Sequence, residues 1–492
     1  MEKLTSNLEK NINYIKKIIN NDPDIKEKRI QLKNIKNNIC ILYSDSLCDG
    51  RKINEIVLNP IINTFKEHIV LRANKIVDLI SDLVLVQNQK IDKLENVIYN
   101  LFSGNTIILI NNIDYALAAD TKLVLSRAIN EPTTEVTVKG PKEAFVEDFN
   151  KNLGLIRKRI KDKKMRTENL NIGRRTKTKV GLLYIEDIIE MKLVNRIKKK
   201  LEQIDIDGIF DSAYIVEFID KQSVTLFPTT IRTERPDIAA ITLLDGKLII
   251  LVDNSPFVLI VPAFFIDFIQ AAEDNYDKPI NATWIRITRF IAFIIVVFLP
   301  AYYISVLTHN HEAIPADLLI NFKTQREGVP FPIMIEVLIM SLAFDILSEA
   351  DIRLPNAMGS AISIVGALIL GEAAIQAGIA SPITVIVVAI TSVSALCLPS
   401  KEFSNAAKLW RLFFMVIAVI FGNIGLIIGS LSFVLHLANT KTSGFPYLRG
   451  VAPFSASDQK NLIARFSRKK LIKRPSLISD RNPERLKVVD KK

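Results

Sequence analysis

The stretch RFIAFIIVVFLPAYYISVL, residues 289–307, divides this chain into two unlike parts. A helix needs roughly 20 apolar residues to cross a bilayer core, and residues 290–307 begin a series of such stretches that continues to residue 437. Residues 1–284 have the mixed charged and apolar composition of a soluble α/β protein, and residues 439–492 are basic and polar. The sequence therefore predicts a large soluble part joined to a polytopic α-helical membrane domain, as in a receptor, a channel or a transporter.

Five apolar segments are candidates for membrane crossings. Residues 290–307 follow two arginines, as expected where a helix enters from the cytoplasmic side. Residues 361–379 and 383–398 are joined by a short turn and predict a helical hairpin, whereas residues 410–437 are long enough for one tilted crossing and too short for two. The basic segments before and after these stretches should both lie inside, which requires an even number of crossings. We therefore predict four crossings, with both termini cytoplasmic.

The fifth segment, residues 331–347, is short and contains Glu336 and Asp345. Nine residues of helix place these carboxylates on opposite faces, so that one buried face cannot hide both. This segment is therefore predicted to be re-entrant or interfacial and not to cross the membrane.

Polar and small residues in the membrane part suggest an ion path and helix contacts. Glu372 lies mid-helix with Gln376 one turn further on, and an intramembrane carboxylate often marks a path for ions or substrate. The alternative is a carboxylate that pairs with a polar neighbour and fixes the packing, and Glu336 is a candidate for the mouth of a path. Two stripes of small residues predict close helix packing, within or between subunits: Ala367, Gly371, Ala374 and Gly378, and Gly422, Gly425 and Gly429.

The soluble part contains the same small unit twice. Residues 39–43 (ICILY) align with residues 180–184 (VGLLY), and residues 104–112 (GNTIILINN) align with residues 246–254 (GKLIILVDN). Both matches have an offset of about 141 residues, as a duplication predicts. Each unit is expected to close with a hairpin, whose Asn or Asp turn residues tolerate a left-handed backbone.

These patterns divide the chain into consecutive parts. They are an N-terminal helical segment (1–36), a first α/β subdomain (37–140), a basic helical linker (141–178), a second α/β subdomain (179–262), a junction (263–287), a transmembrane domain (288–438) and a basic cytoplasmic tail (439–492). The predicted fold class is α+β followed by all-α. Duplicated small α/β units precede a polytopic α-helical membrane domain with about four crossings plus one re-entrant or interfacial segment.

The net charge of +12 is concentrated in residues 151–179 and 439–492. Beside a membrane domain, basic segments favour an anionic lipid surface as the partner and not nucleic acid; a solvated linker and a disordered tail are the alternative. The cysteines Cys40, Cys48 and Cys397 have neither a disulfide pattern nor metal-ligand spacing. Because the N-terminus lacks the apolar core of a signal peptide, the soluble part is expected to stay on the side of synthesis.

The soluble half contains no motif that would indicate catalysis. It has no GxxxxGK[ST] loop, no GxGxxG after a strand, no HExxH and no GxSxG. Its single histidine, His68, is expected to be structural. The sequence therefore predicts a binding or scaffolding module, without a cofactor or a metal, and not an enzyme.

Several short motifs, in the same order along the chain, resemble the A subunits of GerA-type spore germinant receptors. They are KGPKEAF (139–145), DNSPFVLIVP (253–262), EDNY (273–276), REGVPFP (326–332), RLP (353–355), SIVGAL (363–368), SP (381–382), PYL (446–448) and APF (452–454). The positions of main structural interest are Asp253, Pro256, Pro262, Glu273, Asp274, Tyr276, Glu327, Gly328, Pro330 and Pro332. Asn254 stands where the family commonly has glycine, and lysines at 139 and 142 stand where arginines are usual, neither of which disturbs the pattern.

The resemblance implies a subunit of a nutrient-sensing complex in the inner membrane of the spore. Its implied partners are a transporter-like B subunit, which is thought to bind the germinant, and a C-subunit lipoprotein, and it is expected to form a homo-oligomer. The leading hypothesis is a gated cation channel that opens as germination begins. The alternatives are a non-conducting scaffold of the receptor and a secondary transporter.

Overall fold

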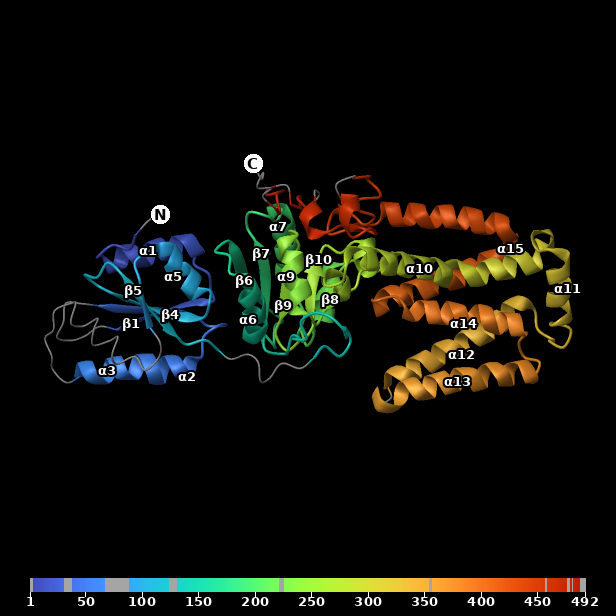
Figure 1. Cartoon of the computed structure of the whole chain (residues 1–492), viewed down its shortest axis with the longest axis horizontal. Helices are drawn as coiled ribbons and strands as arrows, with labels where there is room; N and C mark the ends of the chain where they lie inside the picture. The colour runs from blue at the N-terminus through green and yellow to red at the C-terminus, as the bar shows by residue number, and fades with distance from the viewer. Residues whose placement is uncertain are drawn as a thin grey trace. The chain divides into compact units, whose positions relative to one another are not determined.

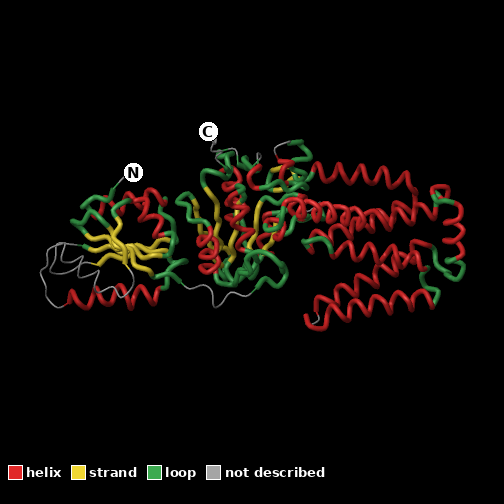
Figure 2. Tube along the Cα trace, in the orientation of Figure 1, coloured by secondary structure: helices red, strands yellow, loops and turns green. Residues whose placement is uncertain are grey.

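A computed structural model of the chain (Figure 1) describes residues 3–30, 38–66, 88–123, 131–220, 225–353, 356–455, 458–475, 478–479 and 481–486. The chain forms two compact units. The first comprises residues 1–221, 230–262 and 471–492, and the second comprises residues 222–229 and 263–470. The two five-stranded sheets lie in the first unit, and the long helices lie in the second (Figure 2).

The N-terminal part of the first unit is built on a five-stranded antiparallel sheet. Its strands are β1 (Ile25–Ile30), β2 (Ile39–Ser44), β3 (Asn88–Ile91), β4 (Asn105–Ile110) and β5 (Ala116–Asp120), in the order β1-β2-β4-β5-β3. One face packs on α1 (Leu8–Ile19) and α5 (Leu94–Leu101), and the other on η1 (Ile53–Leu58) and α3 (Asn59–Lys66), which follow the short helix α2 (Gly50–Lys52). Because both faces are covered, β2 and β4 are continuous apolar runs.

A second five-stranded antiparallel sheet follows in the same unit. Its strands are β6 (Met165–Ile172), β7 (Thr178–Ile185), β8 (Ile231–Thr233), β9 (Leu248–Val252) and β10 (Val258–Val261), in the order β6-β7-β9-β10-β8. Its helices are α6 (Phe149–Arg159), α7 (Met191–Glu202), α8 (Ser212–Ile219) and α9 (Pro236–Leu244). The core between α6, α9 and the sheet is made of buried aliphatic and phenylalanine side chains.

The two sheets have the same strand order, and each follows a helix and an edge strand, α1 with β1 and α6 with β6. The internal repeat therefore includes residues that lie outside the expected subdomains 37–140 and 179–262. Residues 8–30 supply the first helix and strand of the first copy of the repeat, and residues 149–172 supply those of the second copy. The sequence hides β1 and β6 because they are partly exposed edge strands with many charged or polar residues.

The expected hairpin turns are confirmed in both copies of the repeat. Asn112, between β4 and β5, has φ +66°, and Asn254, between β9 and β10, has φ +65°. Both lie in the left-handed region that asparagine tolerates better than most residues. Asn254 can therefore replace a glycine at this turn without breaking the hairpin.

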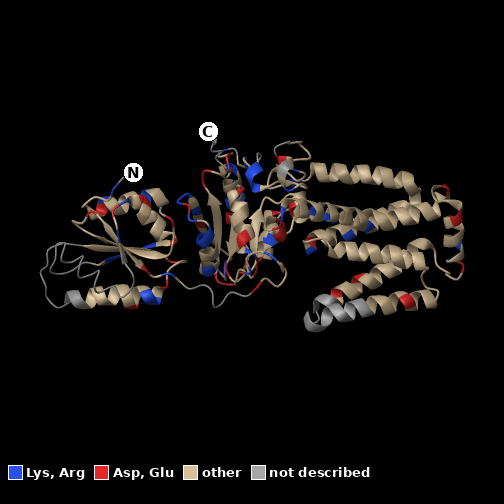
Figure 3. Ribbon diagram, viewed as in Figure 1, with Lys and Arg blue, Asp and Glu red and all other residues tan. Residues whose placement is uncertain are grey.

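The second unit contains long helices joined by short turns. They are α10 (Pro279–Thr308), α11 (Ala316–Thr324), α12 (Ile333–Arg353), α13 (Asn356–Gln376), α14 (Pro382–Leu396) and α15 (Lys401–Asn439). Among the described residues, α10 and α15 are the helices long and apolar enough to cross a membrane by length and composition, and the best window of each has a mean hydropathy of 2.5. The C-terminal part of α15, residues 423–439, carries no Lys, Arg, Asp or Glu (Figure 3).

The segment expected to be re-entrant is a continuous helix. α12 has 21 residues and packs against α13 and α14. The expectation that one buried face cannot hide both Glu336 and Asp345 holds, but each carboxylate meets a different partner. Glu336 bonds to the start of α14, and Asp345 pairs with basic residues of α15. Two partner helices therefore remove the reason for placing this segment at the membrane surface.

α15 is folded back on itself, which corrects the expectation of one tilted crossing over residues 410–437. Phe403 and Phe433 both lie against Phe227, with ring centroids 5.2 and 5.9 Å away. In a straight helix these two residues would be about 45 Å apart, at 1.5 Å per residue. The fold occurs at Gly422, whose φ of 58° and ψ of −145° interrupt the helix. Residues 410–437 alone are too short for two membrane crossings. The helix begins at Lys401, nine residues before Trp410, and its full length forms two arms.

Contacts between the helix ends fix the directions of the segments. Ser381, at the start of α14, lies beside Glu336, at the start of α12, and Ala395, at the end of α14, accepts a hydrogen bond from Ser404, near the start of α15. His309, just after α10, bonds to the carbonyl of Val419 near the fold of α15. Segments α10, α12, α13, α14 and the two arms of α15 therefore alternate in direction, so that the first begins and the last ends on the same side.

The chain after α15 is ordered against the junction that precedes α10. A small hairpin of β11 (Lys441–Thr442) and β12 (Phe445–Pro446) leads to Tyr447, whose hydroxyl donates to the carbonyl of Pro228 at 3.0 Å. Further on, Arg465 donates to the carbonyl of Asn275 at 2.9 Å. The described part of the tail up to residue 470 is thus packed structure, against the alternative of a disordered tail.

Candidate functional site in the helical domain

Glu336 is the centre of a buried polar cluster. Its carboxylate is fully buried and accepts from Arg326 at 2.8 Å, from the Ser381 backbone and hydroxyl at 3.2 Å, and from the Thr384 hydroxyl at 2.8 Å. The Tyr303 hydroxyl lies 3.0 Å from the Thr384 hydroxyl and joins α10 to the cluster. A buried carboxylate with this many donors is satisfied and held in one position.

Local sequence explains how the cluster forms. Ser381 caps α14 and Pro382 occupies its first turn, so the Glu336 carboxylate lies at the positive end of that helix. The REGVPFP motif brings Arg326 to the other side of the carboxylate, and the Pro332 carbonyl accepts the first backbone hydrogen bonds of α12. The carbonyl of Gly328 lies 2.9 Å from where a side chain would begin at Gly378, so the two loops approach too closely for any other residue at Gly378.

A second ion cluster joins α12 to α15. Asp345 lies 2.9 Å from both Lys408 and Arg411. Arg411 is almost completely buried, and its Nε and Nη1 atoms have no hydrogen-bond partner among the described residues. Neither base was among the predicted site residues: Lys408 lies just before the expected crossing of residues 410–437, and Arg411 lies at its second position. The sequence feature that could have indicated this cluster is one acid and two bases within or beside neighbouring apolar stretches.

Glu372 and Gln376 lie apart from both clusters. They are exposed on α13, and Gln376 donates to Glu372 at 3.1 Å across one helical turn. The small residues of the same helix face inward: Gly371 and Ala374 are buried, and a side chain at Gly371 would begin 3.2 Å from Val385 of α14. The structure therefore does not bring Glu372 together with Glu336.

The second stripe of small residues lies between the arms of α15. A side chain at Gly429 would begin 3.1 Å from Phe414, and one at Gly425 would begin 2.7 Å from Ile417. Gly422 forms the fold itself, next to the His309 side chain. These glycines allow the two arms to approach each other closely.

Two acids of the family motifs, one in the junction and one in the second α/β subdomain, have structural roles. Asp274 is buried and pairs with Arg286 at 2.8 Å and with Arg289 at 3.0 Å, and so anchors the first turns of α10. The Asp253 carboxylate accepts from the backbone of Phe149 at 3.2 Å, at the start of α6. Among the described residues, no group of three His, Cys, Asp or Glu side chains is placed to hold a metal ion.

Comparison with known proteins gives consistent matches over almost the whole chain. The family model described as Bacillus/Clostridium GerA spore germination protein matches residues 13–477. Spore germination protein KA of Bacillus subtilis (strain 168) is 36% identical over 478 residues, which cover 97% of this chain and 87% of the relative. Uncharacterized membrane protein YfkQ of the same organism is 32% identical, over 91% of this chain and 87% of the relative.

Two further matches come from other species. Spore germination protein GerLA of Bacillus cereus is 36% identical, over 79% of each chain. The crystal structure of the N-terminal domain of the A subunit of the Bacillus megaterium spore germinant receptor GerK3 is 31% identical and covers 54% of this chain and 98% of that chain, with a TM-score of 0.42.

These matches confirm the resemblance inferred from the short motifs. The family consists of spore germination proteins, in agreement with the expectation that the chain is not an enzyme. With its two long apolar helices and a family match over residues 13–477, the protein is a membrane protein of the Bacillus/Clostridium GerA family of spore germination proteins.

Proposed function

We propose that this protein is the A subunit of a nutrient germinant receptor in the inner membrane of the spore, and that its helical domain oligomerises into a gated cation channel. In this proposal a transporter-like B subunit and a lipoprotein C subunit are its partners, and the basic tail lies near anionic lipid. Its similarity to spore germination proteins over most of the chain supports the receptor role.

The proposal places six segments across the membrane. These are α10, α12, α13, α14 and the two arms of α15, with lengths of roughly 22 to 45 Å at 1.5 Å per residue. Their alternating directions supply the even number that keeps the soluble part and the tail on one side. The outward side chains of α15, such as Ile424, Ile427 and Leu431, are exposed and apolar, which suits contact with lipid or with another subunit.

The observation that carries the channel role is the exposure of Glu372 and Gln376. Every other acid described above in the apolar helices pairs with a basic residue, whereas Glu372 bonds to Gln376 on an exposed surface. A carboxylate facing lipid would cost several kcal/mol. In an oligomer this surface of α13 would instead face a shared, hydrated path for cations.

The test is cation flux through the purified protein in liposomes, alone and with the partner subunits. Glu372→Ala should reduce or deregulate flux at unchanged assembly, and the control Glu312→Gln, at an exposed position outside the long helices, should not. Absence of flux from the assembled protein under every condition would rule out the channel.

The scaffold alternative is supported by the complete pairing of Glu336. It predicts that polar substitutions in the helices change only the abundance of the complex. A secondary transporter is less favoured because the internal repeat lies in the α/β part.

A further inference from the structure

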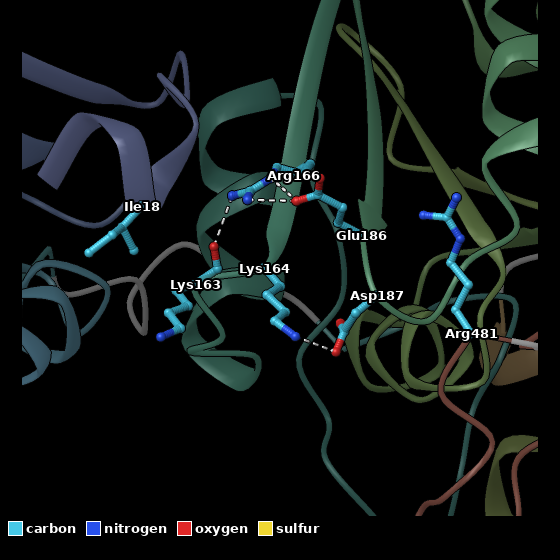
Figure 4. A pocket seen from close by; sticks show the side chains of 7 residues that line it. All are labelled: Ile18, Lys163, Lys164, Arg166, Glu186, Asp187 and Arg481. Carbon is cyan, nitrogen blue, oxygen red and sulfur yellow. Dashed lines mark hydrogen bonds and ion pairs between the residues drawn. The ribbon is translucent and has the colours of Figure 1, made fainter. Parts of the chain in front are cut away.

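The contact between the two copies of the repeat contains a buried ion cluster and a cleft. In the cluster, Arg157 of α6 bonds to Asp22 and lies 3.2 Å from Asp24. The cleft is lined by Ile18, Lys163, Lys164, Arg166, Glu186, Asp187 and Arg481 (Figure 4). Its two carboxylates are paired with bases, and the remaining cations Lys163 and Arg481 point apart. Within the described residues, the charged groups of this contact therefore do not converge on one small ligand.

The loop before β8 connects the second sheet to the helices. Residues 222–229 follow α8 and precede β8 in the sequence, yet they belong to the helical unit. Phe227 of this loop is 1% exposed, and its ring centroid lies 5.2 Å from that of Phe403 and 5.9 Å from that of Phe433. The ring of Phe293, in α10, lies 6.3 Å away. Because Phe403 and Phe433 belong to the two arms of α15, one side chain of the loop joins three helical segments.

The backbone of this loop is fixed by the chain that follows α15. The Tyr447 hydroxyl donates to the Pro228 carbonyl at 3.0 Å, and the Thr442 hydroxyl donates to the Thr229 carbonyl at 2.8 Å. Two successive carbonyls of the loop are thus satisfied within the helical unit, which holds the neighbouring ring of Phe227 in one position.

Two neighbouring strands of the second sheet lead into the same ring cluster. β8 begins at Ile231 and pairs antiparallel with β10. The Ala263 amide donates to the Thr229 carbonyl at 3.2 Å and continues this pairing beyond the ends of both strands. After β10 the chain reaches Phe265, whose ring centroid lies 6.2 Å from that of Phe227. The two strands therefore leave the sheet side by side, and each places a phenylalanine among the helices.

Phe227 closes the open end of the α15 hairpin. Gly422 joins the two arms at one end, and Phe227 contacts both of them near the other, at Phe403 and Phe433. Closely packed side chains have discrete arrangements and do not deform continuously, so a shift of the loop by the width of a ring would repack both arms. β10 is buried along its whole length, so that a movement of the sheet reaches the loop through β10 and its partner β8.

We propose that Phe227 couples the second sheet to the helical unit. In one state its ring holds α10 and the two arms of α15 together, and a displacement of β8 withdraws the ring and lets the arms separate at their open end. An event in the α/β unit that favours one position of β8 would thereby change the packing of the helices. This inference goes beyond the proposed function and does not depend on ion conduction.

The test is amide hydrogen exchange of the purified full-length protein in detergent, measured in β8 and in β6 at the opposite edge of the same sheet. Coupling is reciprocal, so loosening the ring cluster from the side of the helices should loosen β8. Phe433→Leu should speed exchange in residues 231–233 roughly two- to tenfold, as loss of an aromatic pair predicts, and leave residues 165–172 unchanged. The control Phe421→Leu, at an exposed phenylalanine of α15, should change neither strand.

Phe227→Leu completes a double-substitution cycle. Alone it should also speed exchange in β8, and addition of Phe433→Leu should then have little further effect, because the ring that transmits the change is already absent. A purely structural loss of stability would instead speed exchange in β6 and β8 alike. That result, unchanged exchange of β8 in Phe433→Leu, or an effect of Phe433→Leu that persists in Phe227→Leu would overturn the proposal. Because exchange is measured without an ion gradient, failure here and failure of cation flux are separate results.

Discussion

At the scale of single residues, the ion pairs of the helical domain are the features that sequence analysis approached but did not complete. From the sequence, Glu336 was a candidate for the mouth of an ion path, whereas the structure pairs it with Arg326 and Thr384, which lie on other elements. One sequence without an alignment of relatives gives no direct signal for a contact between residues 48 positions apart. An acid inside an apolar stretch is predicted to be important, but its partner can be identified only from the three-dimensional structure.

Removal of Arg326 should be far more damaging than removal of the pair. Arg326→Ala leaves the fully buried Glu336 carboxylate without its cation and should lower the stability of the helical domain by about 3–5 kcal/mol. Glu336→Gln in the same background should recover part of that loss, because a neutral amide needs no counter-ion. Thermal unfolding in detergent would measure both. Lys323→Ala, at an exposed position one turn away, serves as the control, and equal melting temperatures for it and for Arg326→Ala would contradict the role of the pair.

The cysteines provide a second prediction at this scale. Burial raises the pKa of the Cys40 thiol to about 12 and that of Cys48 to about 11, whereas Cys397 is exposed. Alkylation of the folded protein at pH 8 should therefore modify Cys397 and spare the other two cysteines, and Cys397→Ala should abolish the modification.

Thiols in an unfolded chain lose their protons near pH 8.5. Stability contributed by these buried neutral thiols is thus complete below that pH and is lost as the pH rises toward 11 and 12. Rapid alkylation of Cys40 in the native protein would contradict this burial.

At the scale of elements, hydrophobic patterning predicted the central strands, the hairpins and the long apolar helices but missed strands with few apolar residues. The central strands β2, β4, β7 and β9 are apolar runs and were predicted. The edge strands β1 and β6 were assigned to a helical segment and a linker. The fold in α15 was missed because glycine inside an apolar stretch is compatible with either helix packing or a turn, and its conformation cannot be read from the sequence.

Substitution of Gly422 should therefore lower stability more than substitution of Gly425 or Gly429. Its φ and ψ are almost exclusive to glycine, and a side chain would begin 2.9 Å from His309. Gly422→Ala should cost at least about 1–3 kcal/mol and separate the arms of α15. The measurement is thermal unfolding together with a cysteine crosslink between positions 414 and 429. Gly328→Ala, at a position with open space around it, should have little effect on either readout. A normal crosslink in Gly422→Ala would contradict the proposed strain.

At the scale of the whole molecule, the sequence predicted a soluble α/β module followed by a helical membrane domain, and the structure divides into an α/β unit and a unit of long helices. The repeat was predicted from two matches, because buried strands keep their apolar character after a duplication. The contact between the two copies was not predicted, since each copy has kept its core while the charges at their surfaces have diverged.

Arg157 should control how firmly the two α/β units are held together. Arg157→Met leaves Asp22 and Asp24 buried without a cation and should destabilise the contact by about 3–5 kcal/mol. Limited proteolysis between residues 124 and 148 should become faster, while the core of each unit melts at a similar temperature. The control Arg175→Met changes an exposed arginine of the second α/β unit that has no ion pair within the described residues. Unchanged proteolysis in Arg157→Met would show that other contacts hold the units.

The fold of α15 also has a consequence for biosynthesis. α10 is the first helix of its domain to leave the ribosome, and its main packing partner is α15, which is the last. Ser305 bonds to Asn423, and His309 bonds to Val419. Each of these hydrogen bonds can form only after more than one hundred further residues have been synthesised. A chain that stops before residue 401 would hold α10 without its partner. Completion of the last helical hairpin is thus the step at which quality control can distinguish a finished domain from a truncated one.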